Sequence, residues 1–217
     1  MWGRGLRVRT SCMRESIVRL RPYSGRDALE DRSGPPSLGG AWKRAIDVIV
    51  AGVALVVLTP IMLMIAALIR LSTEEPIIHC ERLIGLGGRT FVGYQFRIPA
   101  ANTESARGWA EWLAEGLRRS SLDQLPRLFN VMRGDMSLIG PQPRAAAQLR
   151  DCFARGPECL RARPGLTGIW LSHRPLPGDW RTEIALDRYY VRNWSLRLDI
   201  ALMSKAISAT YRDDRTV

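Results

Sequence analysis

Hydrophobic residues occur along this chain in short clusters, with one long exception. Residues 48–69 contain no charged side chain, and a helix that spans a bilayer needs about 20 such residues. Thr59 and Pro60 lie near the middle of this segment, where a proline removes one helical hydrogen bond and bends the axis. Basic residues flank both ends, so the positive-inside rule selects no spanning direction. The pattern therefore leaves two alternatives: a helix that breaks at Pro60 and returns to the same face, or a kinked spanning helix.

The rest of the hydrophobic pattern predicts shorter elements. Residues 76–82 and 90–97 favour β-strands, and the glycines between them indicate a hairpin. The composition of residues 163–168 indicates a rigid turn. The helical spacing of apolar residues predicts three further helices, over residues 104–119, 179–192 and 195–211.

The most informative local pattern is LRRSSLDQLPRLFNVMRGDMSLIGPQP, residues 117–143. Ser121 precedes Gln124 by three residues, which is the capping-box spacing at a helix start. Asp123 would then lie at or beside a helix N-terminus, which favours the ionised carboxylate. Such a carboxylate among arginines can be a nucleophile, a metal ligand or part of an ion-pair network. Four apolar residues follow with helical spacing and are expected to pack inward: Leu125, Leu128, Phe129 and Met132.

Charge and cysteine content indicate which kinds of partner and metal site this chain is expected to have. The net charge of +11, from 32 Lys and Arg against 21 Asp and Glu, suits a protein that lies on anionic lipid or handles phosphates. Nucleic acid is not an expected partner, because the chain has no recognisable zinc-finger, RNA-binding or helix-turn-helix motif. Residues 1–40 are basic and lack sustained periodicity, so we expect a mostly disordered arm. The four cysteines form no CxxC pair, so we expect reduced thiols and no zinc site.

The segment SLDQLPRLFNVMRGDMSLIGPQPR resembles the signature of the bacterial sugar transferases, which are membrane-embedded phosphoglycosyl transferases. The resemblance continues, in the family's order, through KRAIDVIVAGVALVVLTPIMLMIAALIRL, RPGLTGIW and DRYYVRNWSLRLDI. It implies a mixed α/β, helix-dominated fold with amphipathic helices and a small β-hairpin. Residues 41–71 would form a membrane-embedded re-entrant helix that breaks at Thr59 and Pro60. Residues 72–217 would form a transferase domain on the cytosolic face of the bacterial inner membrane.

The resemblance also implies a reaction. The family moves a sugar phosphate from a nucleotide diphosphate sugar, such as a UDP-sugar, to polyprenyl phosphate, the first membrane step of exopolysaccharide or other surface glycan synthesis. Asp123 and Gln124 stand at the positions of the family's catalytic pair. Asp123 would displace the nucleoside monophosphate, hold the sugar phosphate covalently and lie beside Mg²⁺. The positions that match phosphate-binding arginines are Arg82, Arg97 and Arg163.

Three departures from the family pattern remove charge. Gln124 stands where the family has Glu, Gln95 where it has Lys, and Gln142 where it has Arg. A glutamine can neither accept a proton from an acceptor phosphate nor carry charge for Mg²⁺. Asp135 or Asp187 could supply a compensating carboxylate.

These departures leave three hypotheses. We expect an active transferase, with anionic lipids as further partners and with a homo-oligomer or glycan-assembly partners left open. The alternative is a catalytically impaired homologue that binds the lipid carrier or a partner transferase and regulates glycan assembly. The third is a basic membrane-anchored scaffold with no site.

Overall fold

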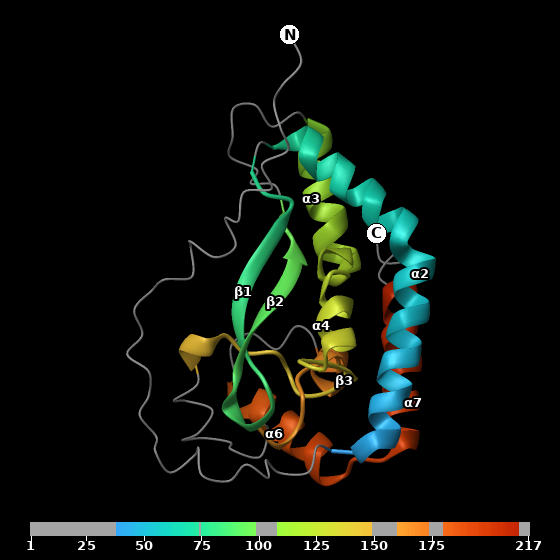
Figure 1. Ribbon diagram of the computed structural model, residues 1–217, viewed down its shortest axis with the longest axis vertical. Helices are drawn as coiled ribbons and strands as arrows, with labels where there is room; N and C mark the ends of the chain where they lie inside the picture. The colour runs from blue at the N-terminus through green and yellow to red at the C-terminus, as the bar shows by residue number, and fades with distance from the viewer. Residues whose placement is uncertain (1–37, 74, 99–107, 149–159, 174–179, 213–217) are drawn as a thin grey trace. The chain divides into compact units, whose positions relative to one another are not determined.

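The computed structural model describes residues 38–73, 75–98, 108–148, 160–173 and 180–212 (Figure 1). Almost all of the predicted basic arm, residues 1–40, lies outside them. The mixed, helix-dominated α/β class is confirmed. The helices are α2 (Gly40–Ser72), α3 (Gly108–Ser120), α4 (Arg127–Arg133), α6 (Trp180–Arg192) and α7 (Leu196–Arg212). The strands are β1 (Ile78–Ile84), β2 (Thr90–Phe96), β3 (Ser137–Ile139) and β4 (Gly165–Thr167).

The long apolar segment forms α2, a helix of 33 residues that continues through Pro60. Figure 1 shows the axis of α2 changing direction part-way along its length. The Thr59 hydroxyl donates a hydrogen bond of 2.5 Å to the Leu55 carbonyl, one turn earlier. The chain is helical on both sides of Pro60 and forms one helix, as in the kinked alternative. A re-entrant path through a bilayer stays a prediction.

Much of the surface of α2 is exposed. Within the described part of the chain, it is the one helix long and apolar enough to cross a membrane, and only 11% of its most apolar stretch is buried inside the protein. Val56 is 77% exposed and Leu63 is 65% exposed. An apolar surface of this size is typical of contact with lipid or with another protein.

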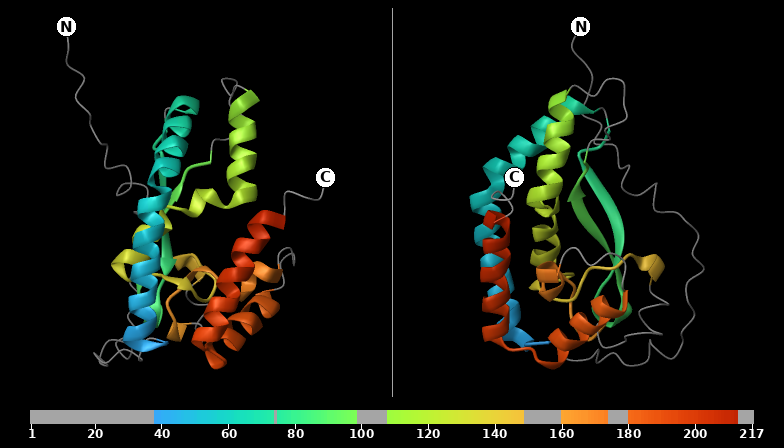
Figure 2. Two further views of the ribbon diagram at one scale, coloured as in Figure 1. Left: turned by 90° about the vertical axis from the view of Figure 1, so that its right-hand side faces the viewer. Right: turned by 180° about the vertical axis from the view of Figure 1, so that it is seen from behind.

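The predicted β-hairpin is confirmed. β1 and β2 are antiparallel, with Ile84 opposite Thr90, and the connecting loop contains Gly87 at φ 66°. Helix α4 lies between this hairpin and α2 (Figure 1, Figure 2). The buried Asn130 of α4 joins it to β2, because its amide donates to the Val92 carbonyl (2.7 Å) and accepts from the Tyr94 N–H (3.1 Å).

The expected rigid turn at residues 163–168 is instead the short strand β4, which pairs in parallel with β3. The two strands are brought together by Gly140 and Gly165. A Cβ at either glycine would overlap the backbone of the other, so this approach requires residues without side chains.

Two hydrophobic clusters share α2. One packs the first half of α2 against α4, β3, α6 and α7, through Ala51, Leu128, Val131, Met136, Leu138, Ile139, Tyr190 and Leu202. The other packs its second half against β2 and α3, through Ile65, Ile69, Phe96, Leu113 and Leu117. One helix therefore connects the two ends of the described fold.

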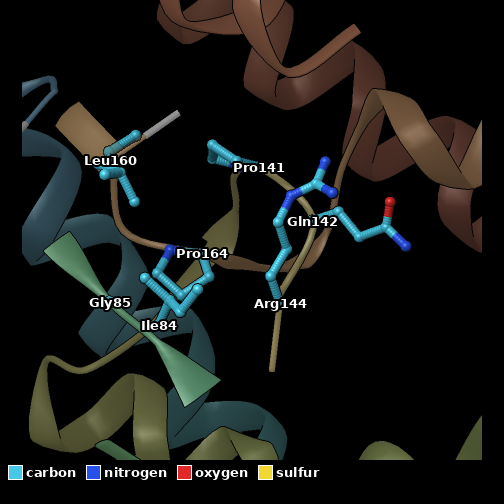
Figure 3. A pocket seen from close by; sticks show the side chains of 8 residues that line it. Ile84, Gly85, Pro141, Gln142, Arg144, Leu160 and Pro164 are labelled. Atoms are coloured by element: carbon cyan, nitrogen blue, oxygen red, sulfur yellow. The ribbon is translucent and has the colours of Figure 1, made fainter. Parts of the chain in front are cut away.

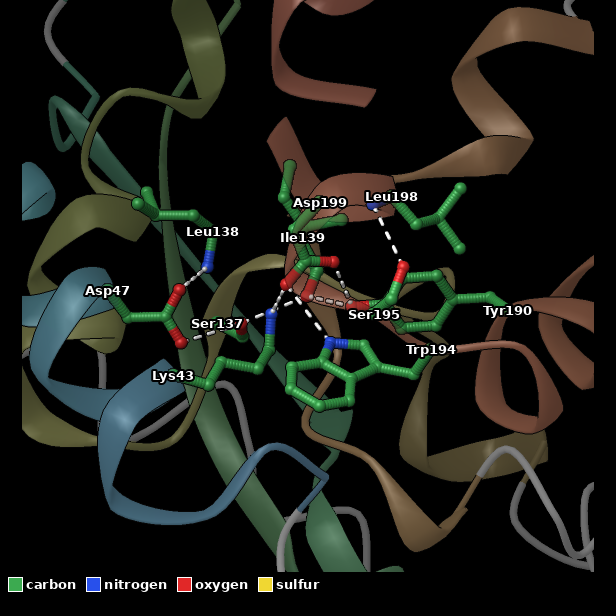
Figure 4. A network of polar contacts seen from close by, with 10 residues as sticks. All are labelled: Lys43, Asp47, Ser137, Leu138, Ile139, Tyr190, Trp194, Ser195, Leu198 and Asp199. Carbon is green, nitrogen blue, oxygen red and sulfur yellow. Dashed lines mark hydrogen bonds and ion pairs between the residues drawn. The ribbon is translucent and has the colours of Figure 1, made fainter. Parts of the chain in front are cut away.

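A buried polar network fixes the first turns of α2 (Figure 4). The Lys43 ammonium lies 2.5 Å from the Asp199 carboxylate of α7, and each side chain is 9% exposed. Asp199 also accepts hydrogen bonds from the Tyr190 hydroxyl (2.8 Å) and the Trp194 indole (3.1 Å). Asp47 accepts from the Ser137 hydroxyl (2.7 Å) and the Leu138 N–H (3.1 Å). These polar groups tie the membrane-compatible helix to β3 and α7.

The predicted start of the Ser121 helix is wrong. Ser121 has φ 55° and makes no side-chain capping bond. A 3₁₀ turn, Leu122–Gln124, comes first, and α4 begins only at Arg127. Pro126 explains the break, because it has no N–H with which to continue a helical hydrogen-bond series from Ser121.

The predicted inward face of α4 is only partly correct. Leu128 is buried, but Phe129 is 50% exposed and Met132 is 38% exposed. Asn130 and Val131 occupy the interior instead. In α3, Trp112 is 75% exposed, whereas Leu113 and Leu117 are buried.

The expectation of reduced thiols is wrong at Cys80, which is disulfide-bonded. That expectation rested on the usual redox state of cytosolic proteins, which says nothing of which cysteines the fold brings together. The other three cysteines, Cys12, Cys152 and Cys159, lie outside the described residues.

Candidate active site

Asp123 lies at the centre of the 3₁₀ turn between α3 and α4 and is half-buried. The turn is closed by backbone hydrogen bonds from Gln124 to Ser121 (3.1 Å) and from Leu125 to Leu122 (3.2 Å). Among the described residues, Ser121 is the one non-glycine residue with positive φ. Such a conformation costs about 1–2 kcal/mol and persists where surrounding contacts enforce it, often at functional sites.

Gln124 is linked to Gln95 through one arginine. The Arg127 guanidinium donates to the Gln95 amide oxygen at 2.9 Å and to the Gln124 amide oxygen at 3.4 Å. Gln95 lies on β2, so these contacts connect the hairpin to the turn that carries Asp123. Sequence reasoning treated Gln95 and Gln124 as separate departures from the family pattern, and the structure brings them to the same side chain.

Electrostatics at Arg127 involve two carboxylates. Burial lowers the pKa of Arg127, while the charges of Glu81 and Asp123 act in the opposite direction. The sequence alone did not point to Glu81. The hairpin register would have done so, because His79 pairs with Gln95 and Glu81, two residues after His79, points to the same face of the strand. Glu81 therefore shares a face with Gln95.

The two predicted phosphate-binding arginines of the hairpin lie away from this contact. Arg82 is exposed and follows Glu81 in β1, so its side chain points to the opposite face of the hairpin. Arg97 forms an ion pair of 2.9 Å with Glu75 and donates to the Pro76 carbonyl. Their phosphate-binding role stays a prediction.

Arg163 lies at the other end of α4 from Asp123. Its Nε donates to the carbonyl of Gly134, at 2.8 Å, immediately after the last residue of α4. A helix of seven residues is about 10 Å long, so in this structure Arg163 and Asp123 do not meet. Burial lowers the pKa of Arg163, the nearby Arg44 lowers it further, and Asp47 raises it.

Neither suggested compensating carboxylate contacts Gln124. Asp187 is 2% exposed and accepts from the Arg144 guanidinium (2.9 Å) and the Gln142 N–H (3.0 Å). Burial raises the pKa of Asp187, and these hydrogen bonds oppose that rise. Asp135 follows the C-terminal end of α4, whereas Gln124 precedes its start.

Gln142 and Arg144 line a small hollow together with apolar residues and backbone (Figure 3). Proline and leucine side chains form much of its wall, including Pro141, Leu160 and Pro164. Asp123 does not line it. The hollow is therefore separate from the Gln95–Arg127–Gln124 contact.

The expected Mg²⁺ has few protein ligands available. Within the described ranges, no group of three or more His, Cys, Asp or Glu side chains is placed to hold a metal ion. Mg²⁺ is commonly held by one or two carboxylates, with the remaining positions filled by substrate phosphates and water. The Asp123 carboxylate therefore fits a metal that arrives with a diphosphate and does not form a site by itself.

Comparison with known proteins adds an independent line of evidence. Residues 38–213 match the family model described as bacterial sugar transferase. The exopolysaccharide production protein ExoY of Sinorhizobium fredii is 33% identical over 79% of this chain and 86% of its own length. The UDP-glucose:undecaprenyl-phosphate glucose-1-phosphate transferase of Caulobacter vibrioides is 34% identical, over 79% of this chain and 70% of its own length.

A third relative is longer. The undecaprenyl-phosphate galactose phosphotransferase of Salmonella typhimurium is 30% identical over 79% of this chain but only 41% of its own length. This chain belongs to the bacterial sugar transferase family.

Proposed function

We propose that this protein transfers a sugar phosphate from a nucleotide diphosphate sugar to polyprenyl phosphate, at the start of exopolysaccharide or other surface glycan synthesis. Family membership and the names of the relatives, which act on undecaprenyl phosphate, support the general reaction. The observation that carries the finer proposal is the position of the half-buried Asp123 in the turn directly before α4, whose first residue is Arg127. The charges of Asp123 and the Arg127 guanidinium act on each other without forming a direct ion pair. Positive charge near a carboxylate nucleophile favours attack on phosphorus, because it offsets repulsion between the two anions.

The proposed reaction has two displacements. An oxygen of Asp123 attacks the phosphorus that carries the sugar, and the bond from that phosphorus to the bridging oxygen breaks. The nucleoside monophosphate leaves with the electron pair. A phosphate oxygen of the polyprenyl phosphate then attacks the same phosphorus and releases the Asp123 carboxylate. Division into two steps replaces one difficult displacement by two easier ones.

The Asp123 carboxylate would be this chain's ligand for a Mg²⁺ bound together with the donor diphosphate, and the metal would supply partial neutralisation of the phosphate charge. Gln124 supplies no charge, and its amide oxygen accepts a hydrogen bond from Arg127. The second displacement therefore needs no proton transfer to Gln124 if the acceptor phosphate reacts as the dianion.

The proposed location is the cytosolic face of the bacterial inner membrane, with α2 embedded from that face. The exposed apolar surface of α2 supports membrane association. The apolar surface extends onto α4, because Met132 approaches Gly52 of α2 and is itself partly exposed. The turn that carries Asp123 lies directly before α4. Such an arrangement would place the reacting carboxylate close to a lipid-borne phosphate.

The experiment is nucleoside monophosphate release by the full chain in detergent, with Mg²⁺, polyprenyl phosphate and a panel of UDP-sugars. Asp123→Asn and Gln124→Glu are measured beside the unmodified protein. We expect release that requires one of the UDP-sugars and that disappears in Asp123→Asn. Release that persists in Asp123→Asn would overturn the role of this residue. If none of the three proteins releases nucleoside monophosphate while all still bind lipid, the proposed function is overturned and a regulatory homologue is favoured.

A further inference from the structure

The Arg127 side chain has an unusual set of contacts. It is the first residue of α4, and its guanidinium donates to two neutral amide oxygens, those of Gln95 and Gln124. Its Nε is buried and has no hydrogen-bond partner within the described residues. A buried donor without a partner destabilises the protein, so a ligand that accepts from Nε would remove this cost.

The charge of Arg127 is also incompletely matched. Among the described residues, no carboxylate forms an ion pair with it. Glu81 and Asp123 act on it only through the longer-range effect of their charges. Arginine remains protonated in proteins. The site therefore contains a half-buried cation that faces amides and has no direct counter-ion among the described residues, and an anionic ligand would supply one.

The two glutamines explain how this cation is kept available. A lysine at position 95 would place a second positive charge against Arg127, and a glutamate at position 124 would pair with it. Gln95 avoids the repulsion that a lysine would cause, and Gln124 avoids the neutralisation that a glutamate would cause. Each amide oxygen still orients the guanidinium.

We propose that Arg127 binds the phosphate groups of the substrate near Asp123. This inference rests on the proposed function. The guanidinium can present two parallel N–H groups to phosphate oxygens, a geometry that an ammonium does not offer. Gln95 and Gln124 are positioning residues in this arrangement. The phosphate belongs either to the donor diphosphate or to the polyprenyl phosphate, which present the same chemistry.

The test measures binding by the full chain in detergent, without turnover. The probes are UDP for the donor diphosphate, uridine as its uncharged control, and short-chain polyprenyl phosphate for the acceptor. Arg127→Gln should weaken binding of UDP or of polyprenyl phosphate at least tenfold and leave uridine binding unchanged. Adding Gln95→Lys to Arg127→Gln should restore most of the lost affinity. Arg119→Gln is the matched control, because Arg119 is 71% exposed and pairs with Glu115, and it should change binding less than twofold.

The outcomes separate the two phosphate sources. Loss of UDP binding in Arg127→Gln assigns the residue to the donor, and loss of polyprenyl phosphate binding alone assigns it to the acceptor. Unchanged binding of both probes by Arg127→Gln would overturn the inference. Arg127→Lys keeps the charge and therefore controls for misfolding. It should bind the affected probe, UDP or polyprenyl phosphate, more tightly than Arg127→Gln does, and equal weakening in both variants would contradict phosphate binding.

Kinetics separate this inference from the proposed function. If the unmodified protein turns over, Arg127→Gln should raise KM for the affected substrate and lower kcat as well. Turnover with unchanged kcat and KM in Arg127→Gln would overturn the inference alone. If UDP binding depends on Arg127 but no UDP-sugar releases monophosphate, the phosphate site stands and the proposed reaction fails.

Discussion

Replacement of Lys43 by methionine tests whether the buried polar network anchors α2. Methionine has a similar length and no charge, so the change removes the ion pair with Asp199 while filling most of the same space. Both side chains of this pair are 9% exposed. Asp199 would then remain buried as an anion, with hydrogen bonds only from Tyr190 and Trp194 among the contacts of Figure 4.

The magnitude follows from the geometry. Removing one partner of a buried ion pair typically costs about 3–5 kcal/mol, because the other charge loses its compensation. Two hydrogen bonds to Asp199 remain, so we expect about 3 kcal/mol, at the lower end of that range. Adding Asp199→Asn should recover at least about 1.5 kcal/mol, because the orphaned charge is removed while an amide oxygen can still accept from Trp194.

The assay is denaturant unfolding of the full chain in detergent, followed by tryptophan fluorescence. Arg119→Met is the control, because its i,i+4 pair with Glu115 is exposed and should contribute less than about 0.5 kcal/mol. A loss in Lys43→Met no larger than in this control would refute the anchoring role. Strictly additive effects of Lys43→Met and Asp199→Asn would refute the coupling between the two residues.

Three further changes test other contacts of the fold. The pKa of Tyr190 is raised by burial and by Asp199, so the folded state keeps its hydroxyl proton above about pH 10, where the unfolded chain releases it. Stability from this group is therefore complete below pH 10 and falls as pH rises further. Unfolding midpoints of the unmodified protein should drop more steeply from pH 9 to 11 than those of Tyr190→Phe. The same pH dependence in both proteins would contradict a raised pKa at Tyr190. Asn130→Ala should cost about 2 kcal/mol, because both hydrogen bonds to β2 are lost, and an unchanged midpoint would show that they are dispensable. Gly165→Ala should cost at least about 2 kcal/mol from overlap with Gly140, whereas the control Gly116→Ala, which meets nothing within 4 Å, should leave stability equal or higher; similar effects would contradict the close approach.

Elements set by local pattern could be predicted from the sequence. The apolar run became α2, the glycine-separated strands became the β1–β2 hairpin, and the last two helical patterns became α6 and α7. In each case the preference of the segment and its tertiary packing agree. The sequence left open whether α2 breaks at Pro60 or continues through it, because a proline signals a bend and does not by itself show where helical hydrogen bonding stops.

Features set by distant contacts could not be predicted. The interior face of α4 depends on Asn130, whose hydrogen bonds reach Val92 and Tyr94 on another element. Phe129 and Met132 follow the helical pattern of core residues but are exposed. A rule that places apolar side chains in a protein core fails where a protein has a second apolar environment available, such as lipid.

The candidate site also combines features set by local pattern with features set by distant contacts. Asp123 was singled out from its motif, whereas the contact between Gln95 and Arg127 joins residues 32 positions apart. Three glutamines read as separate losses of charge in the sequence. In the structure two of them hold one guanidinium, and the third, Gln142, lies near Arg144 and Asp187. Parallel pairing of β3 with β4 likewise depends on two glycines that are separated in sequence.

Covalent attachment of the sugar phosphate to Asp123 is the central claim of the proposed mechanism, and mass spectrometry tests it most directly. The full chain is incubated with Mg²⁺ and the reactive UDP-sugar, without polyprenyl phosphate, then quenched in acid and digested. We expect the peptide that contains Asp123 to gain the mass of one sugar phosphate, and the gain to disappear when polyprenyl phosphate is added before quenching. Nucleoside monophosphate release at a normal rate without any such adduct, or turnover by Asp123→Asn, would contradict the account.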